Sequence, residues 1–113
     1  MGDETLTFNE YQQKARTTAI YPPEGAIPYL ALGLASEAGE VAGKVKKVLR
    51  DNGGYISNDN AGNILKEAAD CLWYIAMLAD ELGVDMGHIA SDNLVKLASR
   101  RERGTLGGSG DER

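Results

Sequence analysis

Two long stretches of the chain repeat their apolar residues with the spacing of an α-helix. Between residues 28 and 50 the apolar stripe advances in steps of four and three, through Leu34, Ala38, Val41, Val45 and Val48. This period places the apolar side chains on one helical face. A second stretch, 60–82, contains the segment 71–78, which is apolar on nearly every side. Alternating strand patterns are missing from the sequence, so it predicts an all-α fold.

Start and stop signals divide the sequence into about four helices joined by short loops. Thr7 and Glu10 have the spacing of a capping box, which predicts a helix start at residue 8. Asn52-Gly53-Gly54 is a strong stop signal, and either Ser57 or Asp59 is expected to cap the next helix. The predicted helices span 8–19, 28–50, 60–82 and 86–101. Together they predict a four-helix bundle.

The bundle is expected to assemble into an oligomer with helices packed across subunits. The chain has 113 residues, which suffices for one modest hydrophobic core. A domain of this size does not easily cover the segment 71–78 on all sides, so neighbouring subunits are expected to do so. Residues 1–102 are predicted to form the helical domain. Residues 103–113 are Gly-rich and are expected to form a flexible C-terminal tail.

Composition excludes several classes of function. The net charge is −5, from 12 basic and 17 acidic residues, which argues against nucleic acid as a partner. No apolar run approaches the roughly 20 residues that cross a bilayer, so we expect no membrane partner. The single cysteine, Cys71, is expected to pack in the interior, and its isolation is compatible with a reducing cytoplasm.

Four carboxylates form two pairs, one pair in each of the two long helices. Glu37 and Glu40 are three residues apart, as are Glu67 and Asp70, so each pair lies on one side of its helix. Each pair borders an apolar stripe, where an unpaired carboxylate is costly. Small residues fill the gaps within the pairs. Solvated surface charge is the alternative interpretation, but these details favour a site.

The chemistry of this donor set predicts a hard divalent cation. Carboxylate oxygens without nearby His or Cys suit Mg²⁺ or Mn²⁺ rather than Zn²⁺ or Cu²⁺. The only histidine, His88, is not part of a Glu-x-x-His motif, which argues against a di-iron site. We interpret His88 as an ordinary helix residue.

Mg²⁺ held by carboxylates commonly meets phosphate oxygens, and cations that could complete a phosphate site are present. Lys44 follows the first carboxylate pair, and Lys96 and Arg103 lie near the end of the last helix. These three are predicted phosphate contacts. Solvated helix faces and favourable charge at a helix C-terminus remain the alternative, and we prefer it for Lys47, Arg50 and Arg101.

The chain resembles the MazG-type nucleotide pyrophosphohydrolases of the all-α NTP pyrophosphatase superfamily. The resemblance covers nearly the whole chain, with one small departure, Ala69-Asp70, where many relatives have Gly-Asp. The motifs that carry it are the two carboxylate pairs, residues 11–22, Leu32–Val41, Asp70–Tyr74, Asn93–Leu97, Arg103-Gly104 and Gly108–Asp111.

This resemblance implies hydrolysis of a (deoxy)nucleoside triphosphate between the α and β phosphates. The products are the nucleoside monophosphate and pyrophosphate, in nucleotide-pool control or house-cleaning. The resemblance also implies two or more Mg²⁺ or Mn²⁺ ions per site, held here by Glu37, Glu40, Glu67 and Asp70. It further implies a homo-oligomer with sites near subunit interfaces, for which we expect a tetramer, otherwise a dimer.

In the expected mechanism, Glu37 or Glu40 also orients or deprotonates the attacking water. Asn93 is expected to bond the sugar or a phosphate, and the C-terminal tail to order over the nucleotide. Trp73 is interpreted as a core residue rather than a stacking platform. Weaker candidates for base contact lie in the first helix and the loop after it, namely Asn9, Gln12, Thr17 and Ile20.

Two alternatives remain open at the level of sequence. A metal-dependent nucleotide sensor without turnover would keep all four carboxylates. A purely structural bundle would carry them as surface charges, and metal would then leave its thermal stability unchanged. Small members of the resembled family occur in bacteria and phages, so the expected location is the cytoplasm of a bacterium or of a phage-infected host.

Overall fold

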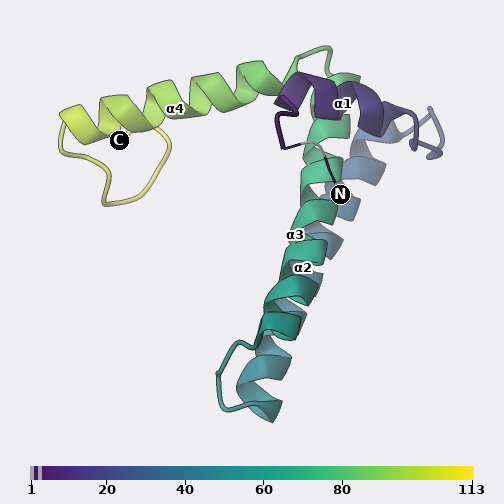
Figure 1. Cartoon of the computed structure of the whole chain (residues 1–113). Coiled ribbons are helices and arrows are strands. Elements are labelled where there is room, and N and C mark those ends of the chain that lie inside the picture. The colour runs from purple at the N-terminus through teal and green to yellow at the C-terminus, as the bar shows by residue number, and fades with distance from the viewer. Residues whose placement is uncertain (1, 3) are drawn as a thin grey trace.

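The chain is entirely helical in its regular structure. The computed structural model describes residue 2 and residues 4–113 (Figure 1). Residues 1 and 3, which belong to the predicted domain 1–102, lie outside the described residues. Within the described part there are four helices and no strand, which confirms the all-α class. The helices are α1 (Phe8–Arg16), α2 (Ala26–Asp51), α3 (Asn58–Glu81) and α4 (Met86–Glu102).

Side-chain caps define the starts of α1 and α3. The Glu10 amide donates to Thr7 Oγ1 at 3.1 Å, and Thr7 N donates to Glu10 Oε1 at 3.2 Å, so the predicted capping box is confirmed. Of the two candidate caps for α3, Ser57 is the N-cap, because its Oγ accepts from the Asn60 amide at 3.1 Å. Asp59 lies within the first turn of the helix.

The first helix is shorter than predicted, ending at Arg16 rather than at residue 19. The hydroxyl of Thr17 donates to the Lys14 carbonyl, and that of Thr18 donates to the Ala15 carbonyl, both at 2.7 Å. Such local side-chain bonds compete with the continuation of a helix. Consecutive threonines were therefore a stop signal that the periodicity alone did not reveal.

Helices α2 and α3 form a long antiparallel pair, and α1 lies across one end of it (Figure 1). The core lies where these three helices meet. Leu30 of α2 and Met77 of α3 are its largest fully buried side chains. Ala15 of α1 and Met86 of α4 belong to the same cluster. We call this region, α1 with the adjoining ends of α2 and α3, the covered end.

A buried glutamine ties the covered end together. Gln12 Nε2 donates to the carbonyls of Ala76 and Val84, and Gln12 Oε1 accepts from the Met86 amide at 2.9 Å. One side chain of α1 thus fixes the end of α3, the loop after it and the start of α4. No local pattern predicted this role for Gln12, because a single Gln in an amphipathic helix usually faces solvent.

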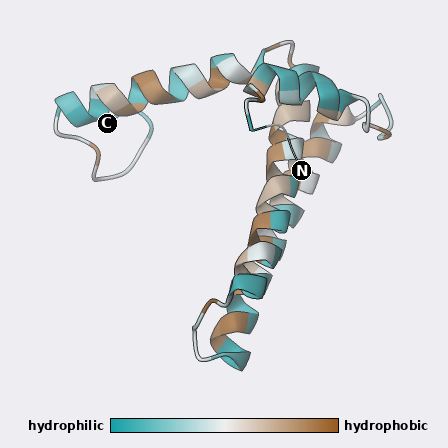
Figure 2. Cartoon of the chain, in the orientation of Figure 1, coloured by the Kyte–Doolittle hydropathy of each residue, from teal (hydrophilic) through white to brown (hydrophobic). Residues whose placement is uncertain are grey.

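Helix α4 extends away from the α2–α3 pair (Figure 1). It contacts α1 and α3 near its start and makes no contact with α2 among the described residues. Figure 2 shows hydrophobic segments along α4 although no other helix lies beside it. The principal extents of the chain are 43 × 43 × 31 Å. The four helices therefore do not close into a bundle within one chain.

The apolar segment 71–78 of α3 is only partly covered by the rest of the chain. Ala76 and Met77 are fully buried, whereas Ile75 remains exposed and the other members are half-buried. Cover of this segment by a neighbouring subunit stays a prediction. No helix of the described residues is long and apolar enough to cross a membrane.

Candidate functional site

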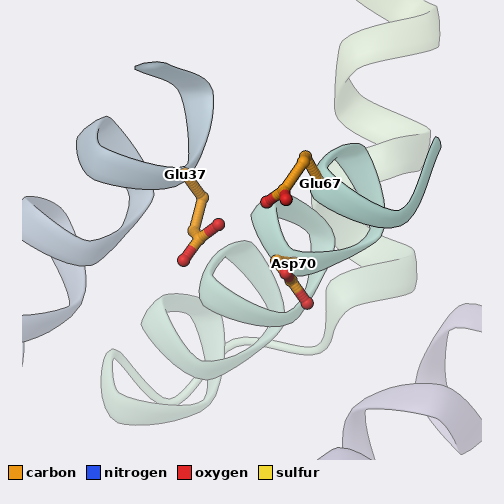
Figure 3. A group of neighbouring side chains, drawn as sticks. All are labelled: Glu37, Glu67 and Asp70. Atoms are coloured by element: carbon orange, nitrogen blue, oxygen red, sulfur yellow. The ribbon is translucent and has the colours of Figure 1, made fainter. Parts of the chain in front are cut away.

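Three of the four predicted carboxylates meet between α2 and α3. Glu37 reaches across from α2 toward Glu67 and Asp70 of α3 (Figure 3). One carboxylate oxygen from each residue lies within 4.8 Å of the other two. The contact arises because Glu67 and Asp70 share a helical face and α2 runs antiparallel beside it. We call these three residues the carboxylate cluster.

Without a bound cation, the carboxylate cluster is electrostatically unfavourable, because its negative charges lie close together. Partial loss of solvent is the main cause that raises the pKa of Glu37, followed by a hydrogen bond with Glu67. The negative charges of Asp70, Glu67 and Glu40 raise this pKa further. None of the ion pairs found within residues 2 and 4–113 gives the cluster a basic partner. Positive charge from outside the chain would therefore stabilise it.

Glu40 lies one helical turn beyond Glu37 and is exposed. It is not one of the three residues whose oxygens converge. Its charge nevertheless acts on Glu37, so it borders the same site. At 100° per residue, Glu40 points 60° to the side of Glu37, which accounts for its separate position. Its role as a fourth ligand stays a prediction.

The carboxylate cluster fits a hard divalent cation. Its donors are all carboxylate oxygens, which Mg²⁺ and Mn²⁺ prefer, and neither His nor Cys belongs to the group. Partial desolvation is the main cause of the raised pKa of Glu37, and the neighbouring carboxylates, whose negative charge such an ion would neutralise, raise it further. Glu37, Glu67 and Asp70 are the residues that would hold the ion.

A pocket of about 340 Å³ opens beside the cluster. It is lined by Glu37, Asp70, Trp73 and Tyr74. The rings of Trp73 and Tyr74 meet edge to face, with centroids 5.1 Å apart. The Tyr74 ring also occupies the space that a Cβ on Gly33 would need, so the glycine permits this close approach of α3 to α2.

Trp73 packs against the core, as predicted, and also borders this pocket. Its indole Nε1 donates to Thr18 Oγ1 at 2.9 Å, which fixes the ring. Tyr74 was not among the predicted site residues. The available signal was its position four residues after Asp70, on the same helical face.

The predicted phosphate contacts are dispersed over the chain. Lys44 lines a separate pocket of about 480 Å³ near the α2–α3 turn, together with Asn60 and Asn63. Asn93 and Lys96 line a shallow pocket on α4. Arg103 lies at the C-terminal end of α4. Because α4 extends away from the α2–α3 pair, one chain does not bring its α4 residues to the carboxylate cluster (Figure 1).

The predicted base contacts lie in and after α1, and several are engaged in internal hydrogen bonds. Asn9 Oδ1 accepts from the Gly87 amide at 2.8 Å, and the Gln12 amide group makes three bonds to backbone atoms. Thr17 bonds the Lys14 carbonyl, whereas Ile20 is almost fully exposed. Their role in base contact stays a prediction.

Comparisons with known proteins point to one family. The sequence profile of the MazG nucleotide pyrophosphohydrolase domain matches residues 27–105, which include the carboxylate cluster and the pocket beside it. The chain is also similar to the protein named Gene 37 protein of Mycobacterium phage L5. The two are 45% identical over 109 residues, covering 91% of this chain and 96% of the phage protein. No solved structure matches the chain significantly.

Proposed function

Because the chain belongs to the MazG nucleotide pyrophosphohydrolase family, we propose that it hydrolyses (deoxy)nucleoside triphosphates between the α and β phosphates. The products are the nucleoside monophosphate and pyrophosphate. The observation that carries this proposal is the convergence of Glu37, Glu67 and Asp70, to which no ion pair of the described residues gives a basic partner. The similarity to a phage protein favours action in the cytoplasm of a bacterium or of a phage-infected host.

Under this proposal, the carboxylate cluster and Glu40 hold two or more Mg²⁺ or Mn²⁺ ions. Bound there, such ions supply positive charge to the triphosphate and acidity to the attacking water. The protein contributes a fixed donor set on two packed helices. Rigid helices position ligands better than loops do, because packing holds their side chains in place.

The chemical step follows from the same residues. A water oxygen attacks the α-phosphorus, and the bond between that phosphorus and the oxygen bridging to the β-phosphate breaks. Pyrophosphate leaves, and Glu37 or Glu40 accepts the proton of the water. Glu37 belongs to the carboxylate cluster, and Glu40 lies one turn along the same helix.

The phosphate contacts are proposed to come from a second copy of the chain. Asn93, Lys96 and Arg103 belong to or adjoin α4, which extends away from the cluster of its own chain. Packing α4 against another copy would cover its apolar side chains and bring these cations toward a neighbouring cluster. We propose a tetramer, otherwise a dimer. Lys44 is proposed to reach the phosphates from the same chain as the cluster.

The nucleoside is proposed to occupy the pocket beside the cluster. Trp73 and Tyr74 provide aromatic surface there, and aromatic rings stack well on bases. Thr17 and Ile20 are the α1-side candidates that remain accessible. A base contact by Gln12 would require three hydrogen bonds at the covered end to break, and one by Asn9 its bond to Gly87.

Product analysis of defined variants tests the proposal. Pyrophosphate release is measured from each common NTP and dNTP with Mg²⁺, with Mn²⁺ and with EDTA. Release is expected with metal only. Glu40→Gln should lower kcat by about 10²–10⁴-fold, the usual loss when a catalytic acid–base group is removed, with an unchanged circular dichroism spectrum.

The matched control is Glu24→Gln, an exposed carboxylate in the loop before α2, which should retain full activity. Retained activity in Glu40→Gln would remove Glu40 from the mechanism. Nucleotide binding without any pyrophosphate release would contradict the enzyme and indicate a sensor.

A further inference from the structure

The connection between α1 and α2, residues 17–25, holds one wall of the pocket beside the carboxylate cluster. The indole Nε1 of Trp73, which lines this pocket, donates to Thr18 Oγ1 at 2.9 Å. The ring of Tyr21 meets the same indole edge to face, with centroids 6.3 Å apart. Two residues of a segment distant in sequence therefore determine how the Trp73 ring lies.

The hydroxyl of Thr18 is oriented to accept this bond. Its proton is donated to the Ala15 carbonyl at 2.7 Å, so the lone pairs of Oγ1 remain for the indole. The N–H is the only polar group of a tryptophan side chain, and the bond to Thr18 uses it. Trp73 consequently offers the pocket an apolar aromatic surface and no free donor.

Tyr21 is itself anchored by other residues, and it leaves the orientation of the indole to Thr18. Arg16 Nη1 donates to the Tyr21 hydroxyl, and Arg16 Nε pairs with Asp80 Oδ2, both at 2.6 Å. Edge-to-face ring contacts tolerate a range of separations, whereas a hydrogen bond weakens steeply when it bends. Of the two contacts made by the connection, the bond from Trp73 to Thr18 is therefore the directional one.

A pocket wall that is fixed in advance favours binding. Trp73 is only half-buried, so packing encloses its ring incompletely. Ordering a side chain at the moment of binding costs free energy, and a side chain that is already ordered avoids that cost. Loss of the bond to Thr18 would thus weaken binding in the pocket and leave the carboxylate cluster intact.

We propose that Thr18 is a positioning residue for nucleotide binding, because it holds the Trp73 indole in the orientation that receives the nucleoside. Thr18 acts through the ring and does not itself contact the nucleotide. It sets the affinity for the substrate rather than the rate of the chemical step. The inference rests on the proposed function for what the pocket binds, whereas the hold of Thr18 on the ring does not depend on it.

Fluorescence of the full chain tests this hold directly, because Trp73 is the only tryptophan of the sequence. Thr18→Val keeps the size of the side chain and removes the hydroxyl. In the nucleotide-free chain it should increase the quenching of Trp73 emission by acrylamide and lower the anisotropy of that emission. Thr18→Ser, which keeps the hydroxyl, should behave like the unmodified chain.

Thr18→Val also removes the bond to the Ala15 carbonyl, and Thr17→Val gives the comparison for that loss. Thr17 makes the equivalent bond, to the Lys14 carbonyl at 2.7 Å. Its substitution should leave the quenching of Trp73 in the nucleotide-free chain unchanged. Unaltered quenching in Thr18→Val would overturn the proposal, and so would the same increase in Thr17→Val.

Steady-state kinetics separates positioning from general damage to the fold. With the nucleotide that gives the fastest pyrophosphate release, Thr18→Val should raise KM by about three- to tenfold, the usual loss for one neutral hydrogen bond. Its kcat should stay within about twofold, since an interaction that acts on binding alone changes KM and not kcat. Thr18→Ser should restore KM. A lower kcat with unchanged KM in Thr18→Val, or no recovery in Thr18→Ser, would contradict the proposal.

The positioning role and the proposed function can fail separately. In a chain that releases no pyrophosphate, the dissociation constant of each common NTP and dNTP, measured from Trp73 emission with Mg²⁺, replaces KM. Weaker binding by Thr18→Val would then retain the positioning role and reject the enzyme. Normal turnover with unchanged KM in Thr18→Val would do the reverse, and a lack of binding by all of these nucleotides would overturn both.

Discussion

The covered end and α4 both consist of amphipathic helices. The apolar side chains are packed at the covered end, whereas those of α4 are exposed to solvent. At the covered end Leu30 and Met77 are fully buried, and the side chain of Gln12 forms hydrogen bonds with buried backbone groups. On α4, Leu94 and Val95 remain 67% and 66% exposed. Apolar periodicity therefore predicts a helix with an apolar face, but it does not tell which neighbour covers that face.

The difference between the two regions shows which of them contributes most to the stability of a single chain. Burial of apolar surface is the main favourable term in folding, and it is concentrated at the covered end. Helix α4 adds regular structure, but most of its apolar side chains remain outside the hydrophobic core. Its apolar residues gain burial only from another molecule, in keeping with the second copy proposed above.

Truncating one apolar side chain in each region gives the largest contrast. Met77→Ala should lower the free energy of unfolding by about 2–5 kcal/mol, because it leaves a cavity in a packed core. Leu94→Ala should change it by less than about 0.5 kcal/mol in dilute protein, as for other exposed sites. Chemical denaturation of the two variants measures both values.

Repeating the denaturation at rising protein concentration sharpens this contrast. If α4 packs against a second copy, the effect of Leu94→Ala grows with concentration, since association contributes to apparent stability. Equal losses in the two variants at high dilution would show that α4 is covered within its own chain, contrary to the fold described.

Two glycines of α2 provide a second, smaller contrast. Gly33 lies against the Tyr74 ring, so Gly33→Ala should destabilise the chain by about 1–3 kcal/mol through overpacking. Gly43 has open space around its Cβ position, so Gly43→Ala should stabilise α2 by about 0.5–1 kcal/mol. Thermal unfolding measures both. A neutral Gly33→Ala would show that α2 and α3 separate easily near the pocket.

The pH dependence of stability should show the smallest effect, at the carboxylate cluster. The pKa of Glu37 is raised above its ordinary value of 4.5 in the folded chain. The folded state then binds the proton more tightly than the unfolded state. Its stability is therefore highest below pH 4.5 as regards this group and falls as pH rises through the raised pKa.

In EDTA, the melting temperature of the unmodified chain should thus decline relative to Glu37→Gln as pH rises above 4.5. Comparison with this variant removes the contributions of Glu10 and Asp51, whose pKa values are lowered and act in the opposite direction. Adding Mn²⁺ should abolish the decline. If the melting temperatures of the two proteins change with pH in parallel, the pKa of Glu37 is not raised in the folded chain.

Much of the fold could be predicted from local sequence signals. The capping residues Thr7 and Ser57 and the stop at Asn52-Gly53-Gly54 lie within one turn of the ends they determine, so local physics suffices. The direction of α4 depends on long-range contacts, such as that of Gln12 with Met86. No local pattern encodes these contacts.

The candidate site divides in the same way. The spacing of Glu67 and Asp70 fixes their shared face, and the stripe of α2 places Glu37 at its edge, so their meeting follows from periodicity. The close approach of Tyr74 to Gly33 and the bond of Trp73 to Thr18 do not. Both features depend on how two surfaces of the folded chain fit together, and this fit cannot be predicted from a single sequence.

Direct titration with Mn²⁺, with free ion followed by electron paramagnetic resonance, tests most directly whether the carboxylate cluster is a metal site. The unmodified chain should bind Mn²⁺ saturably. Asp70→Asn should weaken this binding by about 10–100-fold or more, since even residues that merely support a ligand cost that much. Asp59→Asn, on the same helix but outside the cluster, should leave it unchanged. Absence of saturable binding, or equal binding by Asp70→Asn, would contradict the assignment.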